Sequence, residues 1–111
     1  MTQWIDIGTL ADIPVRGART VQIGGEKDIA VFRAGDDHVF ALVNECPHKK
    51  GPLSQGIVHG HSVTCPLHNW NIALKTGEAQ GNDEGCTPTI AVRMEGDRIL
   101  IARPSAMQAA A

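Results

Sequence analysis

The chain has 111 residues, the size of one compact domain and too short for two ordinary ones. Hydrophobic residues make up 42% and charged residues 20% of the sequence, so an apolar core can form and the composition is not that of an intrinsically disordered chain. Ten basic against twelve acidic residues give a formal net charge of −2. This balance leaves no basic excess to neutralise nucleic-acid phosphates, and we expect no nucleic-acid partner.

The amino-terminal segment MTQWIDIGTLADIP contains two aspartates and has neither the basic leader nor the apolar run of a signal peptide. No stretch of the sequence reaches the ~20 apolar residues that a membrane helix needs. We therefore expect a cytoplasmic protein without a membrane partner. The three cysteines, Cys46, Cys65 and Cys86, are an odd number, which favours ligand chemistry over a disulfide framework in a reducing compartment.

Short apolar runs alternate with Gly- and Asp-rich turns along the chain, and no helical period persists for three turns. This pattern predicts an all-β domain whose strands are joined mainly by hairpins. The segment Gly8–Ile13 is long enough for one helical turn, which we interpret as a lid or connector. The expected strands, in chain order, are Trp4–Ile7, Arg19–Ile23, Ile29–Arg33, Val39–Asn44, Ile57–His59, Ser62–Cys65, Trp70–Ala73, Thr89–Met94 and Arg98–Ala102.

Two segments, Glu45–Gln55 and Cys65–Asn69, interrupt this pattern of strands and turns, and each contains Cys-Pro followed closely by His. They therefore resemble two equivalent loops. A third loop, rich in Gly, Asp, Glu and Asn, is expected between Gly77 and Thr87, before the last hairpin. We assign no function to the tail, residues 104–111.

The chemistry is concentrated in Cys46-Pro47-His48 and Cys65-Pro66-Leu67-His68, which are separated by sixteen residues. A structural zinc site also uses two Cys and two His, but it usually groups the two Cys together and the two His together. A catalytic Cys–His dyad needs only one of the two pairs. A [2Fe–2S] cluster with two Cys on one iron and two His on the other uses all four residues.

The spacing Cys-x-His, then Cys-x-x-His, resembles that of the Rieske iron–sulfur domain, and CPHKKGPLSQG…CPLHNW is similar to its ferredoxin-type branch. The resemblance implies one [2Fe–2S] cluster per chain, with Cys46 and Cys65 on the buried iron and His48 and His68 on the exposed iron. It also implies that Gly51–Leu53 covers one side of the cluster. No catalytic residue is expected on this chain, whose role is electron transfer.

The same resemblance implies a Rieske fold. Its base is an antiparallel β-sandwich or small barrel, and its cluster-binding subdomain, inserted into the base, comprises about residues Cys46–Ile72. We expect residues 1–103 to form this single domain, followed by the tail.

Residues that raise the reduction potential of respiratory Rieske proteins are missing here. Imidazole ligands raise the potential above that of an all-Cys cluster, and hydrogen bonds to the sulfurs tune it further. Respiratory members add a Ser, a Tyr and a disulfide between the two loops. This sequence has Trp70 in place of the Ser, Gly51 and Leu67 in place of the extra cysteines, and no Tyr. We expect a midpoint potential of about −150 to 0 mV.

The stretch from VHGHSVTCPLHNW to the acidic GNDEGC loop and closing hairpin is similar to the small subunit of assimilatory NAD(P)H-dependent nitrite reductase. This similarity implies a partner, the large subunit, that carries FAD, siroheme and a [4Fe–4S] cluster and reduces nitrite to ammonium. The chain would then belong to an oxidoreductase without converting substrate itself. The alternative is a stand-alone ferredoxin that serves an aromatic-ring dioxygenase, with an oxygenase and a reductase as partners. A zinc-stapled interaction module is a third hypothesis.

Five further residues receive structural interpretations. We expect Cys86 to be a partly buried thiol, because the ligand set is complete without it. Trp70 is expected to fill core. His59 and His61 flank a turn glycine and are expected to be an accidental exposed pair, with an auxiliary metal site as the sharper alternative. His38 is expected at a strand edge on the surface.

Overall fold

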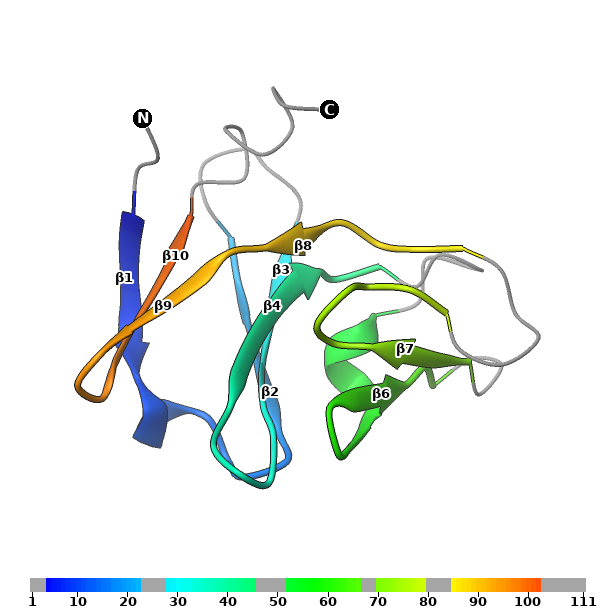
Figure 1. Cartoon of the computed structure of the whole chain (residues 1–111), viewed down its shortest axis with the longest axis horizontal. Helices are drawn as coiled ribbons and strands as arrows, with labels where there is room; N and C mark the ends of the chain where they lie inside the picture. The colour runs from blue at the N-terminus through cyan, green and yellow to red at the C-terminus, as the bar shows by residue number, and fades with distance from the viewer. Residues whose placement is uncertain (1–3, 23–27, 46–51, 67–69, 80–84, 103–111) are drawn as a thin grey trace.

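The computed structural model describes residues 4–22, 28–45, 52–66, 70–79 and 85–102 of the chain. Within these ranges the regular structure consists of β-strands and two short 3₁₀ turns, η1 and η2. The strands form three antiparallel sheets, as Figure 1 shows. The all-β class and the antiparallel sheets expected from the sequence are confirmed.

The three sheets have the strand orders β1-β10-β9, β2-β3-β4-β8 and β5-β6-β7. No helix in the described ranges is long and apolar enough to cross a membrane. The elements are β1 (Trp4–Thr9), η1 (Leu10–Asp12), β2 (Ala18–Val21), β3 (Ile29–Arg33), β4 (Val39–Val43), η2 (Leu53–Gln55), β5 (Ile57–His59), β6 (Ser62–Thr64), β7 (Asn71–Ala73), β8 (Thr89–Ile90), β9 (Val92–Glu95) and β10 (Arg98–Ala102).

The sheet that contains β3 lies between the other two and contributes to a separate apolar core on each of its faces (Figure 1). Because successive side chains of a strand point to opposite faces, Ile29 and Val31 pack with residues of β10, whereas Ala30 and Phe32 pack toward the β5-β6-β7 unit. This two-sided burial explains why β3 reads as a continuous apolar run rather than an alternating one.

The expected strand Thr89–Met94 is interrupted at Ala91, where the chain passes from one sheet to another. β8 pairs with β4, whereas β9 pairs with β10. The carbonyl of Ala91 still accepts a hydrogen bond from the amide of Ala102, at 3.0 Å. The apolar pattern is continuous across this point because Ile90 and Val92, on either side of it, pack in the same core, so the sequence alone did not reveal the change of sheet.

The helical turn expected within Gly8–Ile13 is present as η1, and it acts as a connector rather than a lid. The Asp12 carboxylate accepts a hydrogen bond from the amide of Thr9, at 2.9 Å. Arg33 donates from its Nη1 to the carbonyls of Leu10 and Ile13, at 3.2 and 2.8 Å. Because the side chain of Ile13 is fully buried, this segment is part of the base.

Candidate functional site

The first Cys-Pro-His segment is bracketed by two residues that bond to each other. The side-chain amide of Asn44 donates to Ser54 Oγ at 3.0 Å, and the backbone amide of Ser54 donates to Asn44 Oδ1 at 2.8 Å. Asn44 follows β4, and Ser54 belongs to η2. These two bonds therefore hold the entry and the exit of the segment that carries Cys46 and His48 close together.

The second segment is closed in a similar way. Cys65 directly follows β6, and its amide donates to the carbonyl of Trp70 at 2.7 Å, just before β7. The bond joins the two ends of the segment that carries His68. Because β6 and β7 are antiparallel neighbours that pair Thr64 with Asn71, the Cys65–Trp70 bond continues the ladder to the base of the loop.

The bases of the two segments are packed against each other. Leu53 and Cys65 are buried in one apolar cluster, and Trp70 packs against it, as expected for a core-filling residue. Gly56, just after η2, lies so close to β6 that an added Cβ would be 2.2 Å from the carbonyl oxygen of Thr64. The absence of a side chain at Gly56 thus allows the exit of the first segment to lie beside the strand that leads into the second.

Cys65 is the expected ligand that the described ranges include, and it is 1% exposed. Cys46, His48 and His68 lie outside the described residues. A buried thiolate is costly in an apolar setting without a compensating positive charge, and a metal centre supplies that charge. The position of Cys65 at the base of its loop thus fits a ligand of the inner iron of a cluster.

Cys86 departs from expectation, because it is exposed rather than partly buried. Its neighbour Thr87 is 4% exposed and donates from its hydroxyl to the carbonyl of Val43 at 3.3 Å. Since successive side chains of an extended segment alternate, inward placement of Thr87 directs Cys86 outward. The Gly77 backbone also closes on this segment, because an added Cβ would lie 2.1 Å from the carbonyl oxygen of Thr87.

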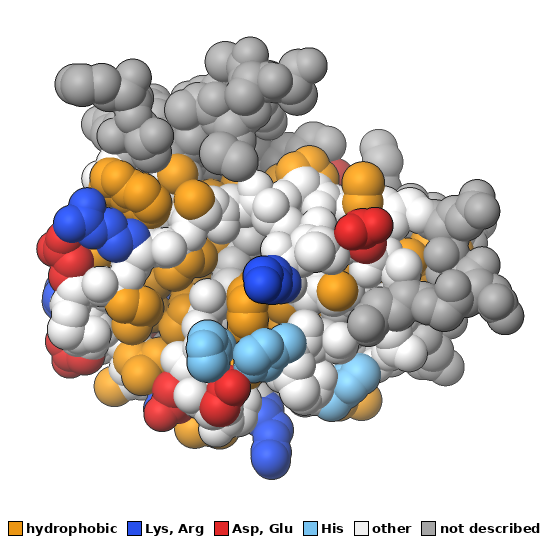
Figure 2. Space-filling model, in the orientation of Figure 1, with side chains coloured by type: hydrophobic (Ala, Val, Ile, Leu, Met, Phe, Trp, Pro, Cys, Tyr) orange, Lys and Arg blue, Asp and Glu red, His pale blue; other side chains and the backbone are white. Residues whose placement is uncertain are grey.

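The exposed histidines have partners that the sequence did not indicate. His59 hydrogen-bonds to Thr64 Oγ1 at 2.8 Å. His61 and His38 both lie close to Asp36, at 2.9 and 3.0 Å. All three histidines are exposed, as expected. A patch of imidazoles with adjacent carboxylates is visible on the face of the molecule in Figure 2. The spacing of these residues in the chain, 25 positions between Asp36 and His61, gave no signal of their proximity.

Comparison with family models identifies a Rieske [2Fe-2S] domain over residues 3–104, nearly the whole chain. Domains of this family bind a [2Fe–2S] cluster. A curated relative, the ferredoxin component of the naphthalene 1,2-dioxygenase/salicylate 5-hydroxylase systems of a Ralstonia species, is 33% identical over 108 residues. The aligned residues cover 91% of this chain and 97% of the relative.

Two solved structures share the fold over most of their length. The putative NADH-dependent nitrite reductase small subunit of Mycobacterium tuberculosis superposes with a TM-score of 0.83 at 24% identity, covering 93% of this chain and 96% of that one. The ferredoxin of carbazole 1,9a-dioxygenase from Nocardioides aromaticivorans IC177 gives a TM-score of 0.80 at 25% identity, covering 90% and 97%. The same fold thus occurs in both classes of protein that the sequence resembles, nitrite reductase small subunits and dioxygenase ferredoxins.

Proposed function

Because the chain belongs to the Rieske [2Fe–2S] domain family, we propose that Cys46, His48, Cys65 and His68 hold its cluster. Both thiolates bind one iron and both imidazoles bind the other, so that each loop contributes one ligand to each iron. The observation that supports this arrangement is the packing of the two loop bases around buried Leu53 and Cys65. We further propose that residues 1–103 are the functional domain, with 46–72 as its cluster-binding part.

The protein is an electron-transfer component of an oxidoreductase system. When bound, the cluster exchanges one electron between two states. The chain itself keeps water from the Cys65 side by packing Leu53 and Ile72, both fully buried, against it. The histidine side is proposed to face outward, so that electrons enter and leave there, while the Asn44–Ser54 and Cys65–Trp70 hydrogen bonds hold the loop bases in place.

We propose that the partner is the large subunit of an NAD(P)H-dependent nitrite reductase, which carries FAD, siroheme and a [4Fe–4S] cluster. The observation that carries this proposal is the sequence order in which Trp70 follows the second motif, an acidic GNDEGC segment follows, and the β9–β10 hairpin closes the domain. This order resembles that of nitrite reductase small subunits, and the fold shared with the mycobacterial protein is compatible with it.

A ferredoxin of an aromatic-ring dioxygenase system is the second candidate. It is favoured by the 33% identity to the Ralstonia ferredoxin component, which extends over nearly all of both chains. In this case the chain would accept electrons from a flavoprotein reductase and pass them to a terminal oxygenase. The ligands and the fold would be the same, and only the proteins that dock would differ.

The two candidates are separated by measuring which acceptor oxidises the reduced protein. The dithionite-reduced protein, freed of excess reductant, is mixed by stopped flow with a siroheme nitrite reductase large subunit or with a terminal dioxygenase, and reoxidation of the cluster is followed by its visible absorption. We expect fast, saturable oxidation by the siroheme protein. Fast oxidation by the oxygenase alone would establish the second candidate. Cys65→Ser serves as the cluster-free control, which should show no signal with either acceptor.

A further inference from the structure

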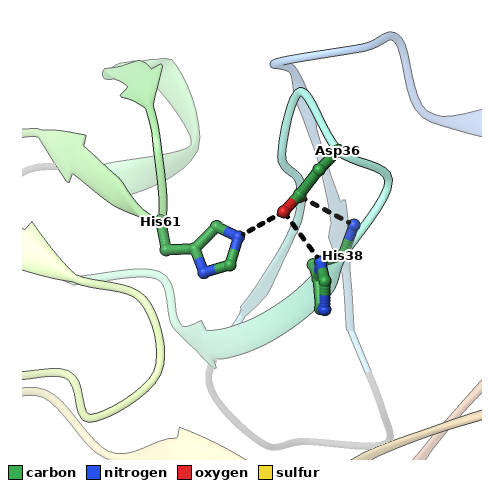
Figure 3. A group of neighbouring side chains, drawn as sticks. All are labelled: Asp36, His38 and His61. Atoms are coloured by element: carbon green, nitrogen blue, oxygen red, sulfur yellow. Dashed lines mark hydrogen bonds and ion pairs between the residues drawn. The ribbon is translucent and has the colours of Figure 1, made fainter.

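Asp36, His38 and His61 form a compact group of metal-ligating side chains, apart from the two Cys-Pro-His segments. Figure 3 shows His61 extending from the β5–β6 turn toward Asp36, which lies with His38 in the β3–β4 turn. Asp36 Oδ2 is 2.9 Å from His61 Nε2 and 3.0 Å from His38 Nδ1. One ligand atom from each of the three residues lies within 4.8 Å of the others.

We propose that this group binds a divalent transition-metal ion, with Zn²⁺ as the fitting example. Two imidazoles and one carboxylate, with a position left for water, form a donor set that Zn²⁺ accepts readily. Tetrahedral Zn²⁺ with bonds of about 2.0–2.1 Å separates neighbouring ligand atoms by roughly 3.3 Å. The carboxylate oxygen already lies 2.9–3.0 Å from both nitrogens, close to this spacing. The two nitrogens lie within 4.8 Å of each other, and rotation of the exposed imidazoles, which closes their separation by up to about 1.5 Å, would admit the ion.

Further contacts hold the two rings and the carboxylate in place. Phe40 lies 5.1 Å from the His61 ring at an angle of 58°, and it stacks with His38 at 6.3 Å. The backbone amide of His38 donates to Asp36 Oδ1 at 3.3 Å, which leaves Oδ2 directed at the imidazoles. The carbonyl of His61 accepts from the amide of Leu74 at 2.9 Å. Such partners orient ligands and strengthen metal binding.

The positive charge of Arg16 opposes binding of a cation at this group. Arg16 lines a hollow of about 260 Å³ together with Gly35, Asp36, Gly60 and His61. Its guanidinium carries a positive charge, which repels a nearby cation. The site should therefore bind Zn²⁺ more weakly than it would without this charge, and neutralising Arg16 should strengthen binding.

A bound ion would join two parts of the molecule that are separate in the chain. Asp36 and His38 belong to the base, whereas His61 belongs to the β5-β6-β7 unit that carries Cys65. An ion held between them would cross-link the cluster-carrying unit to the base. Because the imidazoles must be unprotonated to bind metal, affinity should fall as the pH is lowered.

The test is calorimetric titration of Zn²⁺ into the untagged protein with its [2Fe–2S] cluster in place. We expect one saturable equivalent with the visible spectrum of the cluster unchanged. His38→Gln and His61→Gln should each weaken binding by about tenfold or more, whereas Arg16→Gln should strengthen it severalfold. His59→Gln is the matched control, because His59 is exposed at the end of β5, next to the same turn, but bonds to Thr64, and it should leave the affinity within twofold.

X-ray absorption at the zinc edge of the wild-type complex gives a readout that does not depend on the folding of any variant. Two imidazole ligands with only oxygen as the other donors are expected. Sulfur ligation, or Zn²⁺ uptake in step with loss of cluster absorption, would overturn the proposal. It would likewise be overturned by the absence of saturable binding, or by His59→Gln weakening binding as much as His61→Gln.

Discussion

Asn44 and Ser54 hold each other through two hydrogen bonds, at 2.8 and 3.0 Å, across the segment that carries Cys46 and His48. One of the donors is the backbone amide of Ser54, and the hydrogen bond that it makes is part-buried. The pair therefore sets the separation between the two ends of the first motif. The corresponding bond of the second motif runs between backbone atoms, and no substitution of a side chain removes it directly.

Replacing Asn44 with Ala should destabilise the protein by about 1–3 kcal/mol, because the Ser54 amide loses its acceptor in a part-buried position. Cluster loss should accelerate as well, since the loop ends would no longer be joined. Chemical denaturation and the decay of visible absorption in the presence of a chelator measure the two effects. Asn71→Ala is the control: the Asn71 side chain also accepts a hydrogen bond, from Thr64 Oγ1 at 2.7 Å, but this bond is exposed, so its loss should change both much less. Equal cluster lifetimes for Asn44→Ala and the wild type would contradict the assigned role.

Gly56→Ala should impair cluster incorporation more than it impairs the base of the fold. The new Cβ would collide with the Thr64 carbonyl at 2.2 Å and with Val63 Cγ2 at 2.9 Å, which would push the exit of the first motif away from β6. Iron and sulfide content per chain, together with far-ultraviolet circular dichroism, measures the outcome. Gly96→Ala is the matched control. Its φ of 62° is strained for Ala, but its Cβ meets nothing within 4 Å. The control should therefore lower stability by about 1 kcal/mol and keep the cluster.

The proposed ligand set predicts distinct results for thiolate and imidazole positions. Cys46→Ser and Cys65→Ser should lose the cluster, whereas His48→Cys and His68→Cys should retain part of it with a lowered potential, because a thiolate adds negative charge. Iron analysis and a redox titration followed by electron paramagnetic resonance provide the measurements. For the wild type we expect a midpoint of about −150 to 0 mV. A midpoint well above this range, near that of respiratory Rieske centres, would refute the argument from the missing Ser, Tyr and disulfide.

The pKa of Asp36 is lowered from its ordinary value of 3.8 to about 2, first by the hydrogen bond to His61 and further by those from the backbone and side chain of His38. A carboxyl with a lower pKa in the folded state binds fewer protons there, so its contribution to stability is complete above pH 3.8 and is lost as the pH falls toward 2. Thermal melts of the wild type should therefore decline more steeply than those of Asp36→Asn in this window.

The carboxyl carbon of Asp36, followed by nuclear magnetic resonance, tests the cause of this shift. His61→Ala removes the largest contribution, and it should move the titration midpoint back toward 3.8. His59→Ala removes a nearby imidazole that bonds elsewhere, and it should leave the midpoint in place. An unchanged midpoint in His61→Ala would show that another group holds the carboxylate.

Much of the fold was predictable because local chemistry and tertiary environment agree. The strands Ile29–Arg33, Ile57–His59 and Arg98–Ala102 match the expected bounds, since their apolar runs end at turn residues. The change of sheet at Ala91 was missed because Ile90 and Val92, which flank it, pack in the same core. The η2 turn was also missed, because it lies within a segment expected to be a loop.

In the candidate site, too, only the features set by local sequence could be predicted. The two segments that contain Cys-Pro and a following His could be identified from the sequence alone, because the Cys–His spacing within each is short and the pattern occurs twice. The Asp36–His61 contact could not be predicted from the sequence, because it depends on how two hairpin turns approach each other in space. The exposure of Cys86 follows from the inward placement of Thr87, which only the tertiary structure fixes.

Because β3 lies between two cores, the two parts of the domain depend on each other for burial of their apolar residues. Val31 and Phe32 are adjacent in the chain, yet each is fully buried in a different core. Removal of the β5-β6-β7 unit would expose Phe32 to solvent and leave the base with an uncovered apolar surface. We therefore expect that the β5-β6-β7 unit does not fold apart from the base, and that the whole domain melts in one cooperative transition whose midpoint rises when iron and sulfide are inserted.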